Sequence, residues 1–195
     1  MVTPFTDKPT LVGDRVLLRP FTVDDAEAMA TILTDPDVQR LTGSVTRSED
    51  LGESMPLDRL RDWYGSRAAQ EDRLDLAVVD RATGGVVGEV VLNEWDPDCG
   101  SVNFRTLVGP QGRGRGLGTE AARLVLAHAF ETAGLHRVSL EVFAVNPRAR
   151  HVYETLGFVH EGTRREAHVF DGERVDAHDM AILAQEWRRH GGRPG

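Results

Sequence analysis

The stretch Leu107-Val-Gly-Pro-Gln-Gly-Arg-Gly-Arg-Gly-Leu-Gly-Thr119 decides how this 195-residue chain is interpreted, because glycine occupies every second position from residue 112 to residue 118. Glycine lets the main chain approach a ligand closely. The stretch follows a run typical of a strand and precedes one typical of a helix, whose first amides lack partners and favour an anion. The pattern predicts a phosphate or pyrophosphate site, to which Arg113 and Arg115 would add positive charge.

Two other nucleotide-binding motifs do not fit this stretch. A P-loop requires a lysine after its last glycine, and Lys8 is the only lysine of the chain. The dinucleotide fingerprint Gly-x-Gly-x-x-Gly would require a third glycine after Gly114 and Gly116, where Thr119 stands. These mismatches disfavour a dinucleotide-dependent oxidoreductase, while a glycine-rich turn without a ligand stays open as an alternative.

On both sides of the stretch, the spacing of apolar residues predicts alternating strands and helices. Strands are expected at residues 15–20, 74–80, 86–92, 101–108, 137–145, 158–169 and 175–184. Helices are expected at residues 26–33, 56–70, 119–132 and 147–156, with a turn at 34–37 and a loop at 43–55. Thr22 and Asn146 have the side chains that begin helices. Short turns join the three middle strands into an antiparallel meander, so the order predicts one α/β domain with a mixed sheet.

The composition argues against several classes of protein. No apolar run is long enough to cross a membrane, and residues 1–10 lack the layout of a signal peptide. Cys99 is the only cysteine, so an internal disulfide is excluded, and a cytoplasmic protein is expected. The net charge of −8 disfavours nucleic acid as a partner and would attract a cationic substrate. The histidines show no metal-ligand spacing, so no metal is expected.

The glycine stretch and a second block resemble the GNAT acetyltransferase superfamily. Gln111, Gly114 and Gly116 match the family's CoA-binding pattern Gln/Arg-x-x-Gly-x-Gly/Ala. The second block consists of Leu140-Glu-Val, Asn146-x-x-Ala149 and Tyr153-Glu-x-Leu-Gly-Phe158. The flanking segments, residues 14–25 and 157–176, resemble the branch that acetylates the N-termini of ribosomal proteins. The resemblance covers roughly residues 13–184.

The resemblance implies a mixed, mostly antiparallel sheet with flanking helices and two splayed central strands. It implies a single domain at residues 13–187, between tails at 1–12 and 188–195, and acetyl-CoA as the co-substrate. Asn146 would contact the pantetheine arm or cap its helix. The main chain of Leu107 and Val108 would pair with the pantetheine. The pyrophosphate would bind the amides of Arg113, Gly114, Arg115, Gly116, Leu117, Gly118 and Thr119.

The resemblance also implies two catalytic side chains. Tyr153 matches the family's general-acid tyrosine, which would protonate the departing thiolate. Glu141 matches the glutamate proposed as the base in ribosomal N-terminal acetyltransferases, and Glu89 and Glu94 are rivals on a neighbouring strand. Cys99 lies in a turn away from both blocks, so we expect direct transfer in a ternary complex rather than an acetyl-cysteine intermediate.

The acceptor is expected to be a primary amine. The branch resemblance points to a protein N-terminus, whereas the acidic charge also suits a small cation such as a polyamine, an amino acid or an aminoglycoside. A CoA-binding sensor without catalysis is a further alternative. Trp63, Tyr64 and Trp95 are candidates for lining the acceptor pocket. A homodimer is expected only because the resemblance implies it.

Overall fold

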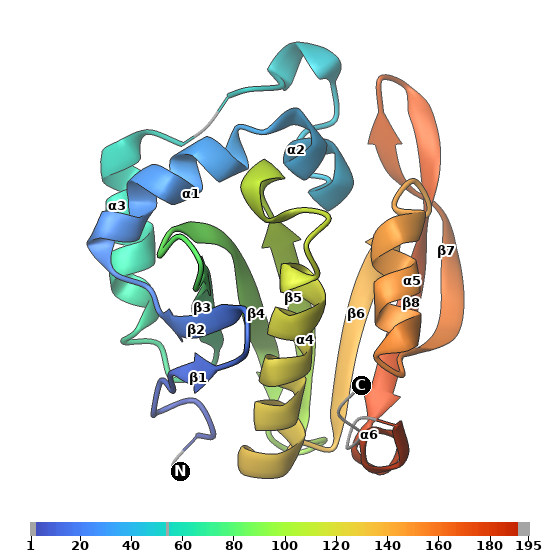
Figure 1. Ribbon diagram of the computed structural model, residues 1–195. Coiled ribbons are helices and arrows are strands. Elements are labelled where there is room, and N and C mark those ends of the chain that lie inside the picture. Colours follow the sequence, from blue (N-terminus) through green and yellow to red (C-terminus); the bar gives the residue numbers. More distant parts are fainter. Residues whose placement is uncertain (1–2, 54, 191–195) are drawn as a thin grey trace.

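An eight-stranded sheet with the strand order β1-β2-β3-β4-β5-β6-β8-β7 forms the centre of the computed structural model, which describes residues 3–53 and 55–190 (Figure 1). The strands are β1 (Leu11–Val12), β2 (Val16–Pro20), β3 (Leu74–Asp80), β4 (Val86–Asp96), β5 (Ser101–Val108), β6 (Arg137–Phe143), β7 (Val159–Phe170) and β8 (Glu173–Leu183). The helices are α1 (Ala26–Leu33), α2 (Pro36–Thr42), α3 (Leu57–Arg67), α4 (Leu117–Ala127), α5 (Pro147–Thr155) and α6 (Ala184–His190). The expected mixed, mostly antiparallel fold with flanking helices is confirmed.

The central strands diverge as expected. β3, β4 and β5 form the antiparallel meander. β5 and β6 run parallel, and they pair only from Ser101 to Asn103 on β5 and from Arg137 to Ser139 on β6. Beyond these three residue pairs, the two strands separate, and a slot opens between them.

Two hydrophobic cores cover the two faces of the sheet. α4 and α5 pack on one face, where Leu117, Val125 and Tyr153 share a core with Phe104 of β5. α1 and α3 pack on the other face, and their core lies over β3 and the adjacent end of β4. None of the residues of this second core comes from β6 or β8. No helix of the described ranges is both long and apolar enough to cross a bilayer.

The segment expected to be the N-terminal tail contributes to the fold, and α6 continues three residues beyond the C-terminal bound expected for the domain. Phe5 is fully buried and meets Trp95 edge to face, with 5.9 Å between the ring centroids. β1, which lies in the segment expected to be the N-terminal tail, pairs with β2. At the other end, α6 extends the chain to His190, and its Trp187 is buried and stacks on Phe130. Residues 1–2 and 191–195 lie outside the described part of the chain.

Two expected local features differ from the structure. The turn expected at residues 34–37 begins α2, because the Asp35 carboxylate accepts a hydrogen bond from the Val38 amide at 2.9 Å and Pro36 occupies the first helical position. The strand expected at residues 86–92 continues to Asp96 through a shift in register, at which Glu94 adopts a φ of 55°.

Candidate active site

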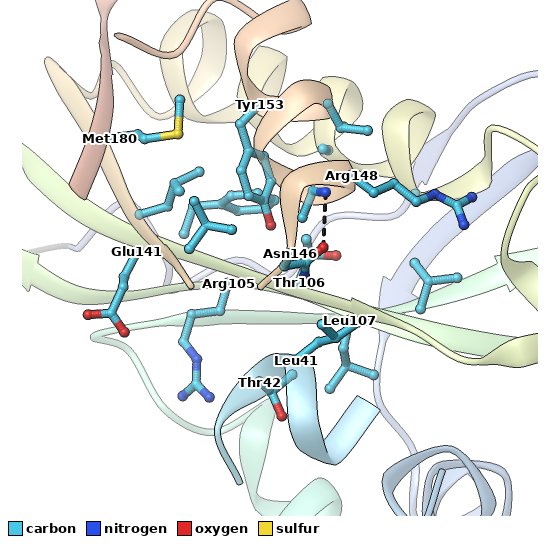
Figure 2. A pocket seen from close by; sticks show the side chains of 18 of the residues that line it. Leu41, Thr42, Arg105, Thr106, Leu107, Glu141, Asn146, Arg148, Tyr153 and Met180 are labelled. Carbon is cyan, nitrogen blue, oxygen red and sulfur yellow. Dashed lines mark hydrogen bonds between the residues drawn. The ribbon is translucent and has the colours of Figure 1, made fainter. Parts of the chain in front are cut away.

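The slot between β5 and β6 opens into a cavity of about 900 Å³. Its walls come from β4, β5 and β6, from parts of β7 and β8, from the glycine loop with the start of α4, and from parts of α5 and α2. Figure 2 shows side chains from these elements converging on the cavity, with Arg148 and Glu141 on opposite sides of Tyr153. The two blocks singled out in the sequence therefore meet in one place.

The glycine loop has the conformation of an anion-binding turn. Gly114 and Gly116 have φ values of 75° and 77°, which favour glycine, and Gly116 is the N-cap of α4. The loop also packs closely on the end of β5, since a Cβ on Gly112 would lie 2.6 Å from the Val108 side chain. The first amides of α4, at residues 117–119, have no acceptor within the helix and lie at the positive end of its dipole. This arrangement fits a pyrophosphate.

The two arginines of the loop do not supply the positive charge expected there. Arg113 pairs with Asp35 and Asp37 of α2, and its Nε donates to the Val108 carbonyl at 3.1 Å. Arg115 pairs with the buried Asp80 carboxylate at 2.7 Å. Both guanidinium groups neutralise neighbouring carboxylates and fix the loop in place. The expectation that their side chains add positive charge to the site is thus corrected, whereas phosphate binding by the amides of the loop stays a prediction.

Arg148 is a cation that the sequence reasoning missed. It lies in the first turn of α5, is exposed, and lines the cavity. One of its guanidinium nitrogens lies 4.0 Å from the position that a Cβ on Gly114 would occupy. The sequence signal for Arg148 is its position directly after Asn146-Pro147. This pair begins α5, whose first turn lies near the glycine loop.

The main chain of β5 presents alternate residues to the slot. The Gly109 amide donates to the Val87 carbonyl at 2.8 Å, so the ladder between β4 and β5 is anchored at this pair. Hydrogen bonding alternates along an antiparallel ladder. The main-chain groups of Leu107 therefore face β4, and those of Thr106 and Val108 face the slot. Of the two residues expected to pair with pantetheine, Val108 has its main chain on the side that allows this.

The start of α5 is held by Asn146. Its Oδ1 accepts a hydrogen bond from the Ala149 amide at 3.1 Å, shown as a dashed line in Figure 2, and Pro147 occupies the first helical position. The capping role is thus observed, and Asn146 also lines the cavity. Contact with a pantetheine arm stays a prediction.

Tyr153 projects from α5 into the cavity, and it is 8% exposed. Its ring packs against Phe104 and Phe158. Figure 2 shows its hydroxyl directed toward Asn146 and Thr106, and no residue of the described ranges hydrogen-bonds to it. Burial raises the pKa of Tyr153 to about 12, so the phenol stays protonated at neutral pH. The role of general acid expected for Tyr153 stays a prediction.

Glu141 lies at the exposed end of the cavity. Its carboxylate pairs with Arg164 of β7, which also pairs with Asp179 of β8 at 3.2 Å. Figure 2 shows the carboxylate pointing away from Tyr153. The Arg164 guanidinium therefore neutralises the Glu141 carboxylate. The role of base expected for Glu141 stays a prediction.

Glu89 and Glu94 both line the cavity from β4. The Tyr64 hydroxyl of α3 donates to Glu89 Oε2 at 3.3 Å. Burial, reinforced by the nearby charge of Asp75, raises the pKa of Glu89 to about 7. Glu94 is exposed at the register shift of β4. Within the described part of the chain, neither carboxylate forms an ion pair with an arginine.

The aromatic residues expected around the acceptor are placed differently. None of the three rings lines the cavity, and only Tyr64 reaches it, through Glu89. Trp63 is 45% exposed and lies under the Arg67 guanidinium, 3.8 Å from the ring centroid. Trp95 packs on the N-terminal segment. Cys99 lies in the exposed turn between β4 and β5, outside the cavity lining.

The tip of the hairpin formed by β7 and β8 joins the two walls of the cavity. The Asp171 amide donates to the Thr46 carbonyl at 2.9 Å, and its carboxylate accepts from the Ser48 amide at 2.7 Å. The Arg40 guanidinium of α2 lies 5.4 Å from the centroid of the Phe170 ring. These contacts join the hairpin to α2 and to the segment that follows it, and none of the residues involved lines the cavity. Among the described residues, no group of three or more His, Cys, Asp or Glu side chains could hold a metal ion.

Comparisons with known proteins agree with this geometry. The model of the acetyltransferase (GNAT) domain matches residues 15–159. Spermidine N(1)-acetyltransferase of Vibrio cholerae is 32% identical over 110 residues, which are 56% of this chain and 64% of that protein. The putative ribosomal N-acetyltransferase YdaF of Bacillus subtilis is 28% identical over 104 residues, 53% of this chain and 57% of that protein.

A solved structure shares the fold over nearly the whole chain. It is the spermidine N-acetyltransferase from Vibrio cholerae in complex with CoA and spermine, with a TM-score of 0.79 and 23% identity over 90% of this chain and 99% of that one. The glycine loop, the slot and the free amides at the start of α4 fit CoA, the carrier that this family uses. The chain belongs to the GNAT acetyltransferase domain family, whose co-substrate is acetyl-CoA.

Proposed function

We propose that the chain transfers the acetyl group of acetyl-CoA to a primary amine of a small, slender cation of the polyamine class, by direct attack in a ternary complex. The observation that carries this proposal is the pair Glu89 and Glu94, two cavity carboxylates without an arginine partner among the described residues. Carboxylates without a cation attract ammonium groups, and attraction is strongest where water is excluded.

The co-substrate would bind through groups at the other end of the cavity. The amides of residues 114–119 and the Arg148 guanidinium would hold the phosphates. The main-chain groups of Thr106 and the amide of Val108 would pair with the pantetheine as an added strand does, because the Val108 carbonyl already accepts a hydrogen bond from Arg113. This arrangement directs the thioester toward Tyr153, whose side chain projects into the same slot.

The chemistry requires a neutral amine and a protonated leaving group. The amine nitrogen forms a bond to the thioester carbon, and the carbon–sulfur bond then breaks. The Tyr153 hydroxyl donates its proton to the departing thiolate, and solvent restores the phenol. A thiol has an ordinary pKa of about 8.5, so a positioned donor speeds its departure.

A protein N-terminus is the second candidate acceptor. The similarity to YdaF favours it, because that relative is described as a putative ribosomal N-acetyltransferase. An α-amino group has a pKa of about 8 and loses its proton more easily than an alkylamine does. Such an acceptor would place its first residues in the same cavity, with the α-amino group directed toward the thioester.

The test is CoA-thiol release from acetyl-CoA with a panel of acceptors. The panel contains spermidine, spermine, amino acids, aminoglycosides, and peptides with free or blocked N-termini. Turnover with polyamines and none with peptides supports the proposal. Turnover only with peptides whose N-terminus is free moves the function to the second candidate. Binding of acetyl-CoA without turnover on any acceptor contradicts both and favours a CoA-binding sensor.

A further inference from the structure

Glu89 occupies the junction of the sheet and the α1–α3 layer, where the slot begins. It lies directly opposite Leu107 in the ladder between β4 and β5. Residues paired in this way have Cβ atoms about 5 Å apart. The preceding residue, Gly88, packs so closely on β5 that a Cβ there would lie 2.1 Å from the Leu107 carbonyl oxygen. Glu89 is therefore fixed beside the β5 residues that border the slot, and it lines the cavity.

Tyr64 holds this carboxylate from the other side. Its hydroxyl donates to Oε2, and its ring packs on Phe21 with 4.4 Å between the ring centroids. Tyr64 is 3% exposed, and burial raises the pKa of its phenol, with the charge of Glu89 adding to the effect. The phenol thus remains a donor at all pH values at which the protein would work. The second carboxylate oxygen of Glu89 is not held by Tyr64.

Several charges act on Glu89 from the elements packed against it. Asp75 on β3 lies nearby and disfavours a second negative charge, although Arg73 binds it through two bonds of 2.7 Å. Arg105 on β5 and Arg73 favour the ionised form, and so does the hydrogen bond from Tyr64. Burial outweighs them, so the carboxylate titrates near pH 7. A general base is most effective when its pKa lies near the working pH.

The two rival carboxylates lack these properties. Glu141 is paired with Arg164, and it points away from the proton donor Tyr153 (Figure 2). Glu94 is exposed at the register shift, five residues along β4 from Glu89. Neither is held by a buried hydrogen-bond donor in the described part of the chain.

We propose that Glu89 is the catalytic base that accepts the proton of the acceptor amine, directly or through one water molecule, and that Tyr64 is its positioning residue. This inference rests on the proposed N-acetyl transfer and names the base of that reaction. As the nitrogen–carbon bond forms, one N–H bond of the amine breaks and its proton passes to a Glu89 oxygen. The proton then leaves to solvent, while Tyr153 protonates the thiolate on the far side of the slot.

The test compares Glu89→Gln, Glu141→Gln, Tyr64→Phe and the matched surface control Glu154→Gln, with the acceptor that the wild type uses best. CoA-thiol release is followed from pH 5.5 to 9.5, and calorimetry measures acetyl-CoA affinity as a check of folding. We expect Glu89→Gln to lower kcat about 10²- to 10³-fold with acetyl-CoA affinity unchanged. Glu141→Gln should lose less than about tenfold, and Glu154→Gln should match the wild type.

Tyr64→Phe tests whether Tyr64 positions Glu89. If it does, the variant should change the pH dependence of kcat, which the loss of a purely structural contact would leave unchanged. The wild type should gain activity as pH rises through about 7, the pKa of Glu89. Because the Tyr64 hydrogen bond lowers that pKa, its removal should shift the acidic limb of the profile to higher pH. The limb should be absent in Glu89→Gln.

The outcomes separate this proposal from the proposed function. Full activity of a folded Glu89→Gln, a larger loss in Glu141→Gln, or an unshifted acidic limb in Tyr64→Phe would each overturn the role of Glu89. If the wild type acetylates only peptide N-termini, the proposed acceptor is wrong, and the same variants still decide on Glu89 with that substrate. If the wild type acetylates no amine at all, the proposed function and the role of Glu89 are both refuted.

Discussion

The ring of Tyr153 meets the ring of Phe104 edge to face, with 6.2 Å between the centroids and 86° between the planes. This contact joins α5 to β5 across the slot, and Phe158 supports the Tyr153 ring at 5.8 Å. The aromatic packing therefore fixes the hydroxyl without using it, so the ring and the hydroxyl can be tested separately.

Tyr153→Phe should abolish most turnover and leave the fold intact. The change removes a hydroxyl that hydrogen-bonds to none of the described residues, while the ring contacts remain. We expect kcat to fall about 10²- to 10³-fold, because loss of a positioned general acid has effects of that size. CoA-thiol release measures kcat, and calorimetry should show unchanged acetyl-CoA affinity. A variant with wild-type kcat would remove Tyr153 from the mechanism.

Gly116→Ala should weaken acetyl-CoA binding, whereas Gly134→Ala should not. Both glycines have positive φ, 77° and 68°, so each substitution should cost about 1 kcal/mol of stability. A Cβ on Gly116 would also lie 2.9 Å from the Arg15 guanidinium, and Gly134 has open space. Calorimetry with acetyl-CoA and urea unfolding of both variants check this. Equal loss of affinity in the two variants would argue against the loop as the phosphate site.

Arg148→Ala should lower acetyl-CoA affinity about ten- to hundredfold, since a hydrogen bond to a charged group contributes about 1.5–3 kcal/mol. The control is Arg150→Ala on the same helix, because Arg150 pairs with Glu154 and does not line the cavity. The affinity of the wild type should fall with added salt, and the slope should be smaller for Arg148→Ala. Similar affinities of the two variants would contradict a phosphate contact by Arg148.

Glu89→Gln should make the protein more stable than the wild type above pH 7. The pKa of Glu89 is raised from 4.5 to about 7 on folding, so its stability contribution is fully present below pH 4.5 and is lost as pH rises through 7. Glutamine can still accept the Tyr64 hydrogen bond and has no charge to bury. Urea unfolding at pH 5 and pH 8 should show the difference between variant and wild type growing by about 2–3 kcal/mol. A constant difference would mean that Glu89 is solvated in the folded protein.

Much of the fold followed from local sequence patterns. The bounds expected for β3, β5 and α1 agree with the structure, because their apolar periodicity is strong and their turns are short. The slot and the glycine loop followed from a motif whose backbone requirements are strict. Phe5 was missed because prolines and polar residues surround it, so its burial depends on Trp95, far away in the sequence.

The electrostatics of the site could not be predicted from the sequence. Arg113 and Arg115 look like phosphate ligands next to glycine, yet Asp35, Asp37 and Asp80 bind them. Those partners are more than 30 residues away, so only the tertiary fold reveals them. The same holds for Glu89, whose raised pKa depends on a helix and a neighbouring strand that no local pattern connects to it.

The three residue pairs between β5 and β6 affect how firmly the two halves of the sheet are held together. Within the described part of the chain, they are the only strand pairing that joins the half of the sheet made of β1 to β5 to the half made of β6, β8 and β7. A strand-like ligand in the gap would form hydrogen bonds to both halves of the sheet and would restrict their motion relative to each other. Acetyl-CoA should then slow amide hydrogen exchange along both borders of the gap, and raise the melting temperature more than contacts to the glycine loop alone would. The donor molecule would thereby complete the sheet as well as supply the acetyl group.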